Sequence, residues 1–327
     1  MRAPRPPCFF SKPIGNDMPE LVTAPTREDV VRARETIGGR LPRTPLLGNR
    51  TMGARLKCEL FQRTGSFKVR GAMNKISSLS EAEKARGVIA ISAGNHAQAV
   101  AFGAAAEGID ALVVMWDGAS AQKIAATRGY GAAVDLEASG PTDAFARLDA
   151  LIEETGRTLV HPFDDPLVLA GQGTVGLEIE EDAPDVDAVI VPVGGGGLIG
   201  GIQAAIGDHV RVIAVEPDQS TALHSAIAAG EPVPVSPRSI ADGLSAPFAG
   251  RIATETCKDL ERVLVTEDEI EHAFRFLYER AKLACEPAGA VASAAWLAGK
   301  IEAKNPVILV SGGNVAGQTA AAILARP

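Results

Sequence analysis

The chain has 327 residues, of which 46% are hydrophobic and 22% charged, and its formal net charge is −8. This balance is typical of a globular protein and excludes collagen-like, coiled-coil and disordered chains. The acidic charge is spread along the sequence, which argues against a nucleic-acid partner, because phosphate backbones bind clustered cations.

Residues 1–22 are predicted to form a flexible N-terminal extension, since their one apolar patch is too short for a secretory signal. After this segment, short apolar runs alternate with alanine-rich helical stretches. The runs at 87–92, 187–193, 210–216 and 306–313 are typical of parallel strands that helices cover on both faces. The sequence therefore predicts an α/β protein, and no apolar run is long enough to span a membrane.

Two further local patterns bear on structure and compartment. Thr266 and Glu269 have the spacing of a capping box, which predicts a helix that starts after Thr266. The cysteines are far apart and show no C-x-x-C spacing, which favours a reduced, cytoplasmic protein without a disulfide or zinc framework. They are Cys8, Cys58, Cys257 and Cys285.

Ligands of parallel α/β sheets bind where strands lead into helices, and Lys68 stands at such a junction. It follows a Thr-Gly-Ser turn and opens a helical stretch, where the helix dipole disfavours a cation. A neutral or imine-linked lysine would remove this conflict. A surface lysine that extends from a loop is the alternative interpretation.

Polar residues also follow two other predicted strands. Ser92, Asn95 and His96 surround a predicted helix start, whose free N–H groups suit a carboxylate or a phosphate. Simple helix capping and an interior histidine are the alternatives here. Ser311 ends the last predicted strand before Gly312 and Gly313, which by themselves indicate only a turn.

Four consecutive glycines, Gly194 to Gly197, join a predicted strand to a helix. A backbone without Cβ atoms can surround an anion with N–H donors, and the helix dipole adds to the attraction. The spacing Gly195-x-Gly197-x-x-Gly200 also matches a dinucleotide-binding fingerprint, with Glu216 where a ribose-binding acid would lie. From the local pattern, an NAD-binding protein is therefore an alternative.

Six motifs in chain order carry more information than any of these junctions alone. They are TGSFKVRGA (64–72), SAGNHAQA (92–99), HPFDDPLVLAGQGTVGLE (161–178), VPVGGGGLIGG (191–201), EPAGA (286–290) and VSGGN (310–314). Together, from about Arg43 to Asn314, they resemble the fold-type II pyridoxal-phosphate enzymes. The match is nearest to the short biodegradative threonine/serine ammonia-lyases (dehydratases), with serine racemases as relatives. A dinucleotide site would leave Lys68, Asn95 and Ser311 without a role.

The resemblance implies a tryptophan synthase β-like fold in which pyridoxal 5′-phosphate lies between two parallel-sheet lobes. Lys68 would be the Schiff-base and catalytic lysine, and Ser311 would face the pyridine nitrogen. Asn95 would bind the phenolic oxygen, and Phe67 and Glu286 would be further cofactor contacts. Gly194, Gly195, Gly196, Gly197 and Leu198 would bind the phosphate through their N–H groups. The substrate carboxylate would meet Ser92, Ala93, Gly94, Asn95 and His96.

The implied activity is β-elimination of L-threonine or L-serine, a small amino-acid substrate, to 2-oxobutanoate or pyruvate plus ammonia. Alternatives are an ammonia-lyase for another β-hydroxy amino acid such as 3-hydroxyaspartate, a serine racemase, or β-replacement with sulfide. Racemases resemble this chain but have a second serine where it has Ala93. We therefore expect elimination without appreciable racemisation.

The resemblance also sets expectations about a cation, domains and assembly. Relatives that bind a divalent cation use a glutamate at the position of Glu216 and an acid six residues later, where this chain has Ala222; Asp218 is a possible substitute. A large domain is expected over 23–86 and 161–327, and a small substrate-closing domain over 87–160. Few residues follow Asn314, so a C-terminal regulatory domain is not expected. The resemblance implies a homodimer or a homotetramer.

Overall fold

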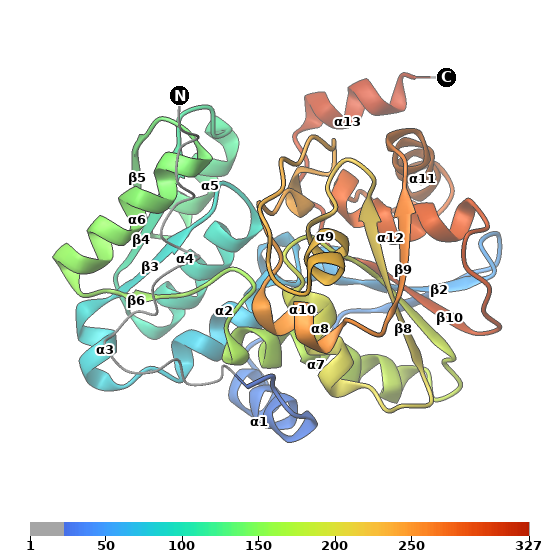
Figure 1. Cartoon of the computed structure of the whole chain (residues 1–327), viewed down its shortest axis with the longest axis horizontal. Coiled ribbons are helices and arrows are strands. Elements are labelled where there is room, and N and C mark those ends of the chain that lie inside the picture. The colour runs from blue at the N-terminus through green and yellow to red at the C-terminus, as the bar shows by residue number, and fades with distance from the viewer. Residues whose placement is uncertain (1–22, 327) are drawn as a thin grey trace.

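The structure, a computed structural model, describes residues 23–326, so Cys8 and the predicted extension lie outside the described residues. It contains two sheets with helices packed around them, and α2 and α7 lie between the sheets (Figure 1). The larger sheet has the strand order β1-β2-β10-β7-β8-β9, and the smaller has the order β5-β4-β3-β6. The predicted α/β class is confirmed.

The larger sheet is parallel apart from one antiparallel pair, β1 with β2, at its edge. All five positions of β7 and of β10 are buried, as expected of central strands covered on both faces. One apolar core lies between this sheet and α11 and α12, and a second involves α7 and α8. The strands are β1 (Leu46–Asn49), β2 (Ala54–Cys58), β7 (Ala188–Pro192), β8 (Arg211–Pro217), β9 (Glu261–Val265) and β10 (Pro306–Val310).

The smaller sheet is entirely parallel. Its strands are β3 (Val88–Ile91), β4 (Ala111–Trp116), β5 (Ala133–Ala138) and β6 (Thr158–Leu159). All four positions of β3 are buried, and α4 and α6 contribute apolar side chains to the cores around it. These strands lie within the segment predicted as the small domain, but the division into domains stays a prediction.

Some of the helices begin where the sequence supplies a side-chain cap, among them α1, α3, α5, α7 and α11. The predicted capping box of Thr266 and Glu269 is confirmed at the start of α11, and Thr26 with Asp29 forms another at α1. The helices are α1 (Arg27–Ile37), α2 (Lys68–Ser77), α3 (Glu81–Arg86), α4 (Asn95–Glu107), α5 (Ala121–Gly129), α6 (Pro141–Thr155), α7 (Pro166–Asp182), α8 (Gly197–Ala205), α9 (Ala222–Ala229), α10 (Arg251–Thr256), α11 (Glu267–Glu279), α12 (Pro287–Leu297) and α13 (Gly317–Leu324).

A buried cluster of charges connects α2 to β2 and α7. The Arg70 guanidinium contacts Glu59 at 2.8 Å and Glu178 at 2.7 Å, and the Lys57 ammonium contacts Glu178 at 2.7 Å. The side chains of Lys57 and Glu59 are fully buried and that of Arg70 nearly so. Each buried charge in the cluster is compensated by an opposite charge. Removal of one partner would leave an uncompensated buried charge and weaken the contact between α2 and the larger sheet.

The thiols of Cys58, Cys257 and Cys285 are free and buried. Burial raises the pKa of each of them, so none is a reactive thiolate at neutral pH. Within residues 23–326, no helix is long and apolar enough to cross a membrane.

Candidate active site

The segment that carries Lys68 is hydrogen-bonded to the segment that follows β10. The Phe67 N–H donates to the Ser311 carbonyl at 3.2 Å, and the Gly313 N–H donates to the Gly65 carbonyl at 2.9 Å. An isolated bridge between Ser66 and Gly312 lies between these bonds. The start of α2 is therefore held at the carboxyl end of β10, the edge where parallel sheets bind their ligands.

The Lys68 amine belongs to the first residue of α2 and points toward the segment after β6. It donates to the Pro162 carbonyl at 2.8 Å and lies 5.3 Å from the centre of the Phe67 ring. Burial lowers the pKa of Lys68 to about 8, partly opposed by the charge of Glu286. Near pH 8 a substantial fraction of this amine is neutral, which suits a nucleophile or a base.

A chain of hydrogen bonds connects the two sheets beside this lysine. The Asn95 amide donates to Glu286 at 2.7 Å, and the Asn314 amide donates to the Asn95 side-chain oxygen at 2.8 Å. Burial raises the pKa of Glu286 to about 7, and the charge of Asp242 adds to the rise. The predicted residues Asn95 and Glu286 are therefore in direct contact, although 191 positions separate them.

The loop before α4 and the first turn of α4 present backbone N–H groups and a neutral imidazole. Gly94 is the N-cap of α4 and has no side-chain cap, and its own N–H donates to Ser92 Oγ at 3.1 Å. His96 Nε2 lies 2.8 Å from the Val160 carbonyl, and burial, together with the charge of Lys68, lowers the pKa of His96 to about 3. His96 Nε2 is thus engaged with the backbone. A substrate contact by His96 stays a prediction.

The glycine loop cannot accept side chains. A Cβ at Gly195 would lie 2.3 Å from the Phe163 ring, and one at Gly196 would lie 2.3 Å from the Ala253 Cβ. Gly196 also has φ +91°, which strains other residues. The loop leads into α8, which starts at Gly197, and the neighbouring Leu198 is buried. These close contacts explain why the loop consists of glycines. The N-terminus of α8, to which the loop leads, remains available for an anion.

We predict that Gly195→Ala weakens cofactor binding severalfold or more. The added methyl would overlap the Phe163 ring, and such overpacking typically costs about 1–3 kcal/mol. The dissociation constant of pyridoxal phosphate, measured by ultrafiltration of the apoenzyme, checks this. Gly129→Ala is the control, because a Cβ there meets nothing within 4 Å. Equal affinities in the two variants would contradict the tight fit.

The residues that gather here fit pyridoxal phosphate. The glycine loop leaves a helix N-terminus for the phosphate, and Lys68 supplies an amine for the aldehyde. Ser66 Oγ and His96 Nδ1 are buried without a partner among the described residues, as groups awaiting a ligand would be. Sequence reasoning assigned no role to Ser66, Pro162 or Asn314. All three lie inside the quoted motifs, and this position is the one feature of the sequence that could have indicated them.

Comparison with known proteins decides the family. A model of the pyridoxal-phosphate-dependent enzymes matches residues 40–312. The chain belongs to this family. It is 43% identical to L-threonine dehydratase catabolic TdcB of Escherichia coli K12, over 88% of this chain and 92% of that protein. It is 45% identical to L-threonine ammonia-lyase of Thermotoga maritima, over 89% and 76%.

Solved structures agree with the family. Maize serine racemase superposes with a TM-score of 0.85 at 35% identity, covering 91% of this chain and 96% of that one. The serine racemase of Dictyostelium discoideum gives a TM-score of 0.84 at 36% identity, covering 90% of this chain and 100% of that one. The predicted fold type, the resemblance and the cofactor, pyridoxal 5′-phosphate, are confirmed.

In this enzyme Glu216 serves as a helix cap. Its two carboxylate oxygens accept the N–H groups of Leu223 at 2.8 Å and His224 at 2.9 Å, at the start of α9. Burial raises its pKa to about 7. Both oxygens are thus engaged, and residues 23–326 contain no group of three or more acidic, histidine or cysteine side chains placed to hold a metal ion. A cation site at Glu216, with Asp218 as a second ligand, stays a prediction.

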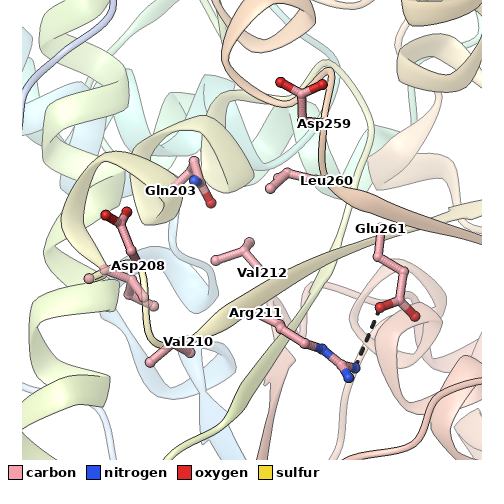
Figure 2. A pocket seen from close by; sticks show the side chains of 10 residues that line it. Gln203, Asp208, Val210, Arg211, Val212, Asp259, Leu260 and Glu261 are labelled. Carbon is pink, nitrogen blue, oxygen red and sulfur yellow. Dashed lines mark ion pairs between the residues drawn. The ribbon is translucent and has the colours of Figure 1, made fainter.

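A cavity of 340 Å³ lies away from the predicted site residues, between the end of α8 and the amino ends of β8 and β9 (Figure 2). Its wall includes Asp208, Asp259 and the ion pair of Arg211 with Glu261 at 3.4 Å. Because the glycine loop and Lys68 lie at the carboxyl ends of the strands, this cavity is at the opposite edge of the sheet. None of the predicted site residues lines it.

Proposed function

We propose that the enzyme catalyses the elimination of water from L-threonine, L-serine or both, giving 2-oxobutanoate or pyruvate plus ammonia. The observation that carries the proposal is the half-buried Lys68 amine, of lowered pKa, beside the Asn95–Glu286 contact and the glycine loop. Relatives named L-threonine dehydratase and L-threonine ammonia-lyase, at 43% and 45% identity, support the substrate.

The proposed roles follow the positions of the side chains. Bound pyridoxal phosphate supplies the electron sink for breaking the bonds at the α-carbon. Lys68 holds the cofactor aldehyde, Gly194 to Leu198 hold the phosphate, and Asn95 hydrogen-bonds the phenolic oxygen. Ser311 donates one hydrogen bond to the pyridine nitrogen, Phe67 supports the ring, and Glu286 orients Asn95 at 2.7 Å.

Lys68 also moves the proton in this proposal. With cofactor and substrate bound, the Lys68 Nζ would be the base that takes the α-proton, and the burial that lowers the pKa of Lys68 favours the neutral form that this role requires. The β-hydroxyl would leave as water, and the proton that it carries away balances the one taken from the α-carbon. Hydrolysis of the remaining enamine, after tautomerisation to an imine, releases the 2-oxo acid and ammonia.

We propose that the loop from Ser92 to His96 binds the substrate carboxylate. Ala93 and Gly94 bring the chain to the start of α4, where the N–H groups lack a side-chain cap. A carboxylate is stabilised there by the N–H donors and by the helix dipole. The small domain, 87–160, would close over the substrate and exclude water.

We predict that wild-type enzyme incubated with L-serine forms pyruvate and little D-serine. The residue after Ser92 is Ala93, which has no proton to deliver to the opposite face of the α-carbon. Pyruvate and D-serine are measured in the same reaction by coupled assay and chiral chromatography. D-serine at a rate comparable to pyruvate would contradict this assignment of Ala93.

A panel of β-hydroxy amino acids tests the substrate. L-threonine, L-serine and 3-hydroxyaspartate are compared by kcat/KM with detection of the 2-oxo acid. The proposal expects the two neutral substrates to be preferred. A preference for 3-hydroxyaspartate would change the substrate while keeping the chemistry. We also propose a cytoplasmic homodimer or homotetramer, whose assembly light scattering of the purified enzyme would check.

A further inference from the structure

A row of aromatic rings crosses the boundary between the two sheets. The Phe163 ring contacts the Phe248 ring at 5.5 Å between centroids, and the Phe248 ring contacts that of Phe145 at 6.1 Å. Phe145 belongs to α6 beside the smaller sheet, and Phe248 lies in the loop before α10. Phe163 is buried, whereas Phe145 and Phe248 are only half-buried. Two apolar rings thus remain partly exposed at this boundary.

The row begins next to the reacting groups. Phe163 directly follows Pro162, whose carbonyl accepts a hydrogen bond from the Lys68 amine at 2.8 Å. The Phe163 ring also lies against Gly195 of the glycine loop. A ligand joined to Lys68 and held by that loop would therefore have this aromatic row as a neighbour.

The backbone around Phe248 is anchored to the same elements. The Gly250 N–H donates to the Gly195 carbonyl at 2.9 Å, and the Val235 N–H donates to the Pro247 carbonyl at 2.8 Å. The Ile252 N–H donates to Asp164 at 3.0 Å. These bonds fix the loop against the glycine loop and the Phe163 segment, so the ring of Phe248 has a defined position.

Two charged side chains near this boundary, Lys123 and Asp242, form an ion pair. The Lys123 ammonium of α5 contacts Asp242 at 2.5 Å, so these two charges are compensated by each other, and the three side chains of the row are themselves apolar. An apolar wall favours hydrogen or methyl at the β-carbon and disfavours a carboxylate, because an unpaired charge loses its hydration there. Two rings at such a wall would also disfavour a bulky substituent.

We infer that Phe145 and Phe248 form the wall of the substrate pocket that contacts the β-substituent and restricts the enzyme to small, uncharged amino acids. The inference deepens the proposed function and rests on it for the identity of the substrate. It makes Phe248 a specificity-determining residue. Substrates with a longer β-substituent are excluded by the rings and not by the chemistry at Lys68.

Binding of unreactive amino acids tests the wall independently of elimination. The probes are L-2-aminobutyrate, which has the methyl group of threonine, and L-phenylalanine. Each is titrated into the holoenzyme, and the dissociation constant is read from the absorbance change of the cofactor. For Phe248→Ala we expect the affinity for L-phenylalanine relative to L-2-aminobutyrate to rise about tenfold or more, the scale of hydrophobic-pocket discrimination. Phe145→Ala should shift the ratio in the same direction, and Phe248→Leu should give a smaller rise.

Phe102→Ala is the matched control. Phe102 is also half-buried and belongs to an aromatic pair, with Tyr130 at 5.8 Å, and neither residue is among the predicted site residues. Its ratio should equal that of the wild type. An unchanged ratio in both Phe248 variants, or an equal shift in Phe102→Ala, would overturn the inference. If the wild type does not deaminate threonine or serine, the proposed function is contradicted. The ratio of the two dissociation constants still tests the aromatic wall in that case.

Discussion

Replacing Lys68 by alanine is expected to lower kcat/KM for L-threonine by at least about a thousandfold, since the variant loses both the cofactor link and the base. The visible absorbance of lysine-linked pyridoxal should disappear with it. The structure supports both roles of Lys68, because its amine is half-buried, has a lowered pKa and lies at the same edge of the sheet as the glycine loop. Production of 2-oxobutanoate and the absorbance spectrum are the two readouts.

Lys75→Ala is the matched control for this experiment. Lys75 lies on the same helix and is paired with Asp165 at 2.8 Å. Its removal should leave the absorbance of the bound cofactor intact. If Lys68→Ala kept the absorbance and half of the activity, the lysine assignment would be wrong.

Replacing Arg70 by leucine is expected to lower the free energy of unfolding by about 3–5 kcal/mol, the cost of breaking a buried ion pair from one side. Without the guanidinium, Glu59 loses its cationic partner at 2.8 Å and keeps only a hydrogen bond from Thr44, and Glu178 keeps Lys57 as its cationic partner. Urea unfolding of the apoenzyme, followed by circular dichroism, measures the change without a contribution from cofactor binding.

The exposed pair of Arg55 and Asp185 gives the comparison. These side chains meet at 2.6 Å, but Asp185 is 59% exposed, so Arg55→Leu should cost at most about 1 kcal/mol. A loss from Arg70→Leu no larger than that from Arg55→Leu would show that the buried cluster does not hold α2 in place.

The α/β class and the glycine loop could be predicted from the sequence because both are local patterns. Apolar runs of strand length reveal buried parallel strands, and four consecutive glycines require close contacts of the kind that Phe163 and Ala253 make. The antiparallel pairing of β1 with β2 was not predicted, because it depends on where the chain after α1 joins the edge of the larger sheet.

The contacts between site residues join positions that are far apart in the chain, and the sequence did not predict them. Asn95 meets Glu286, Lys68 meets the Pro162 carbonyl, and Glu216 caps α9 where a cation ligand was considered. Such contacts depend on how two sheets pack together and not on spacing within one motif. Motif order indicated which segments gather, but only the packing sets which atoms face each other.

The conversion of L-threonine by the purified, pyridoxal-phosphate-loaded enzyme tests the central claim most directly. The account predicts 2-oxobutanoate and ammonia in equal amounts, in a reaction that requires the cofactor and Lys68. No 2-oxobutanoate from threonine and no pyruvate from serine, in an enzyme that carries its full complement of cofactor, would contradict it.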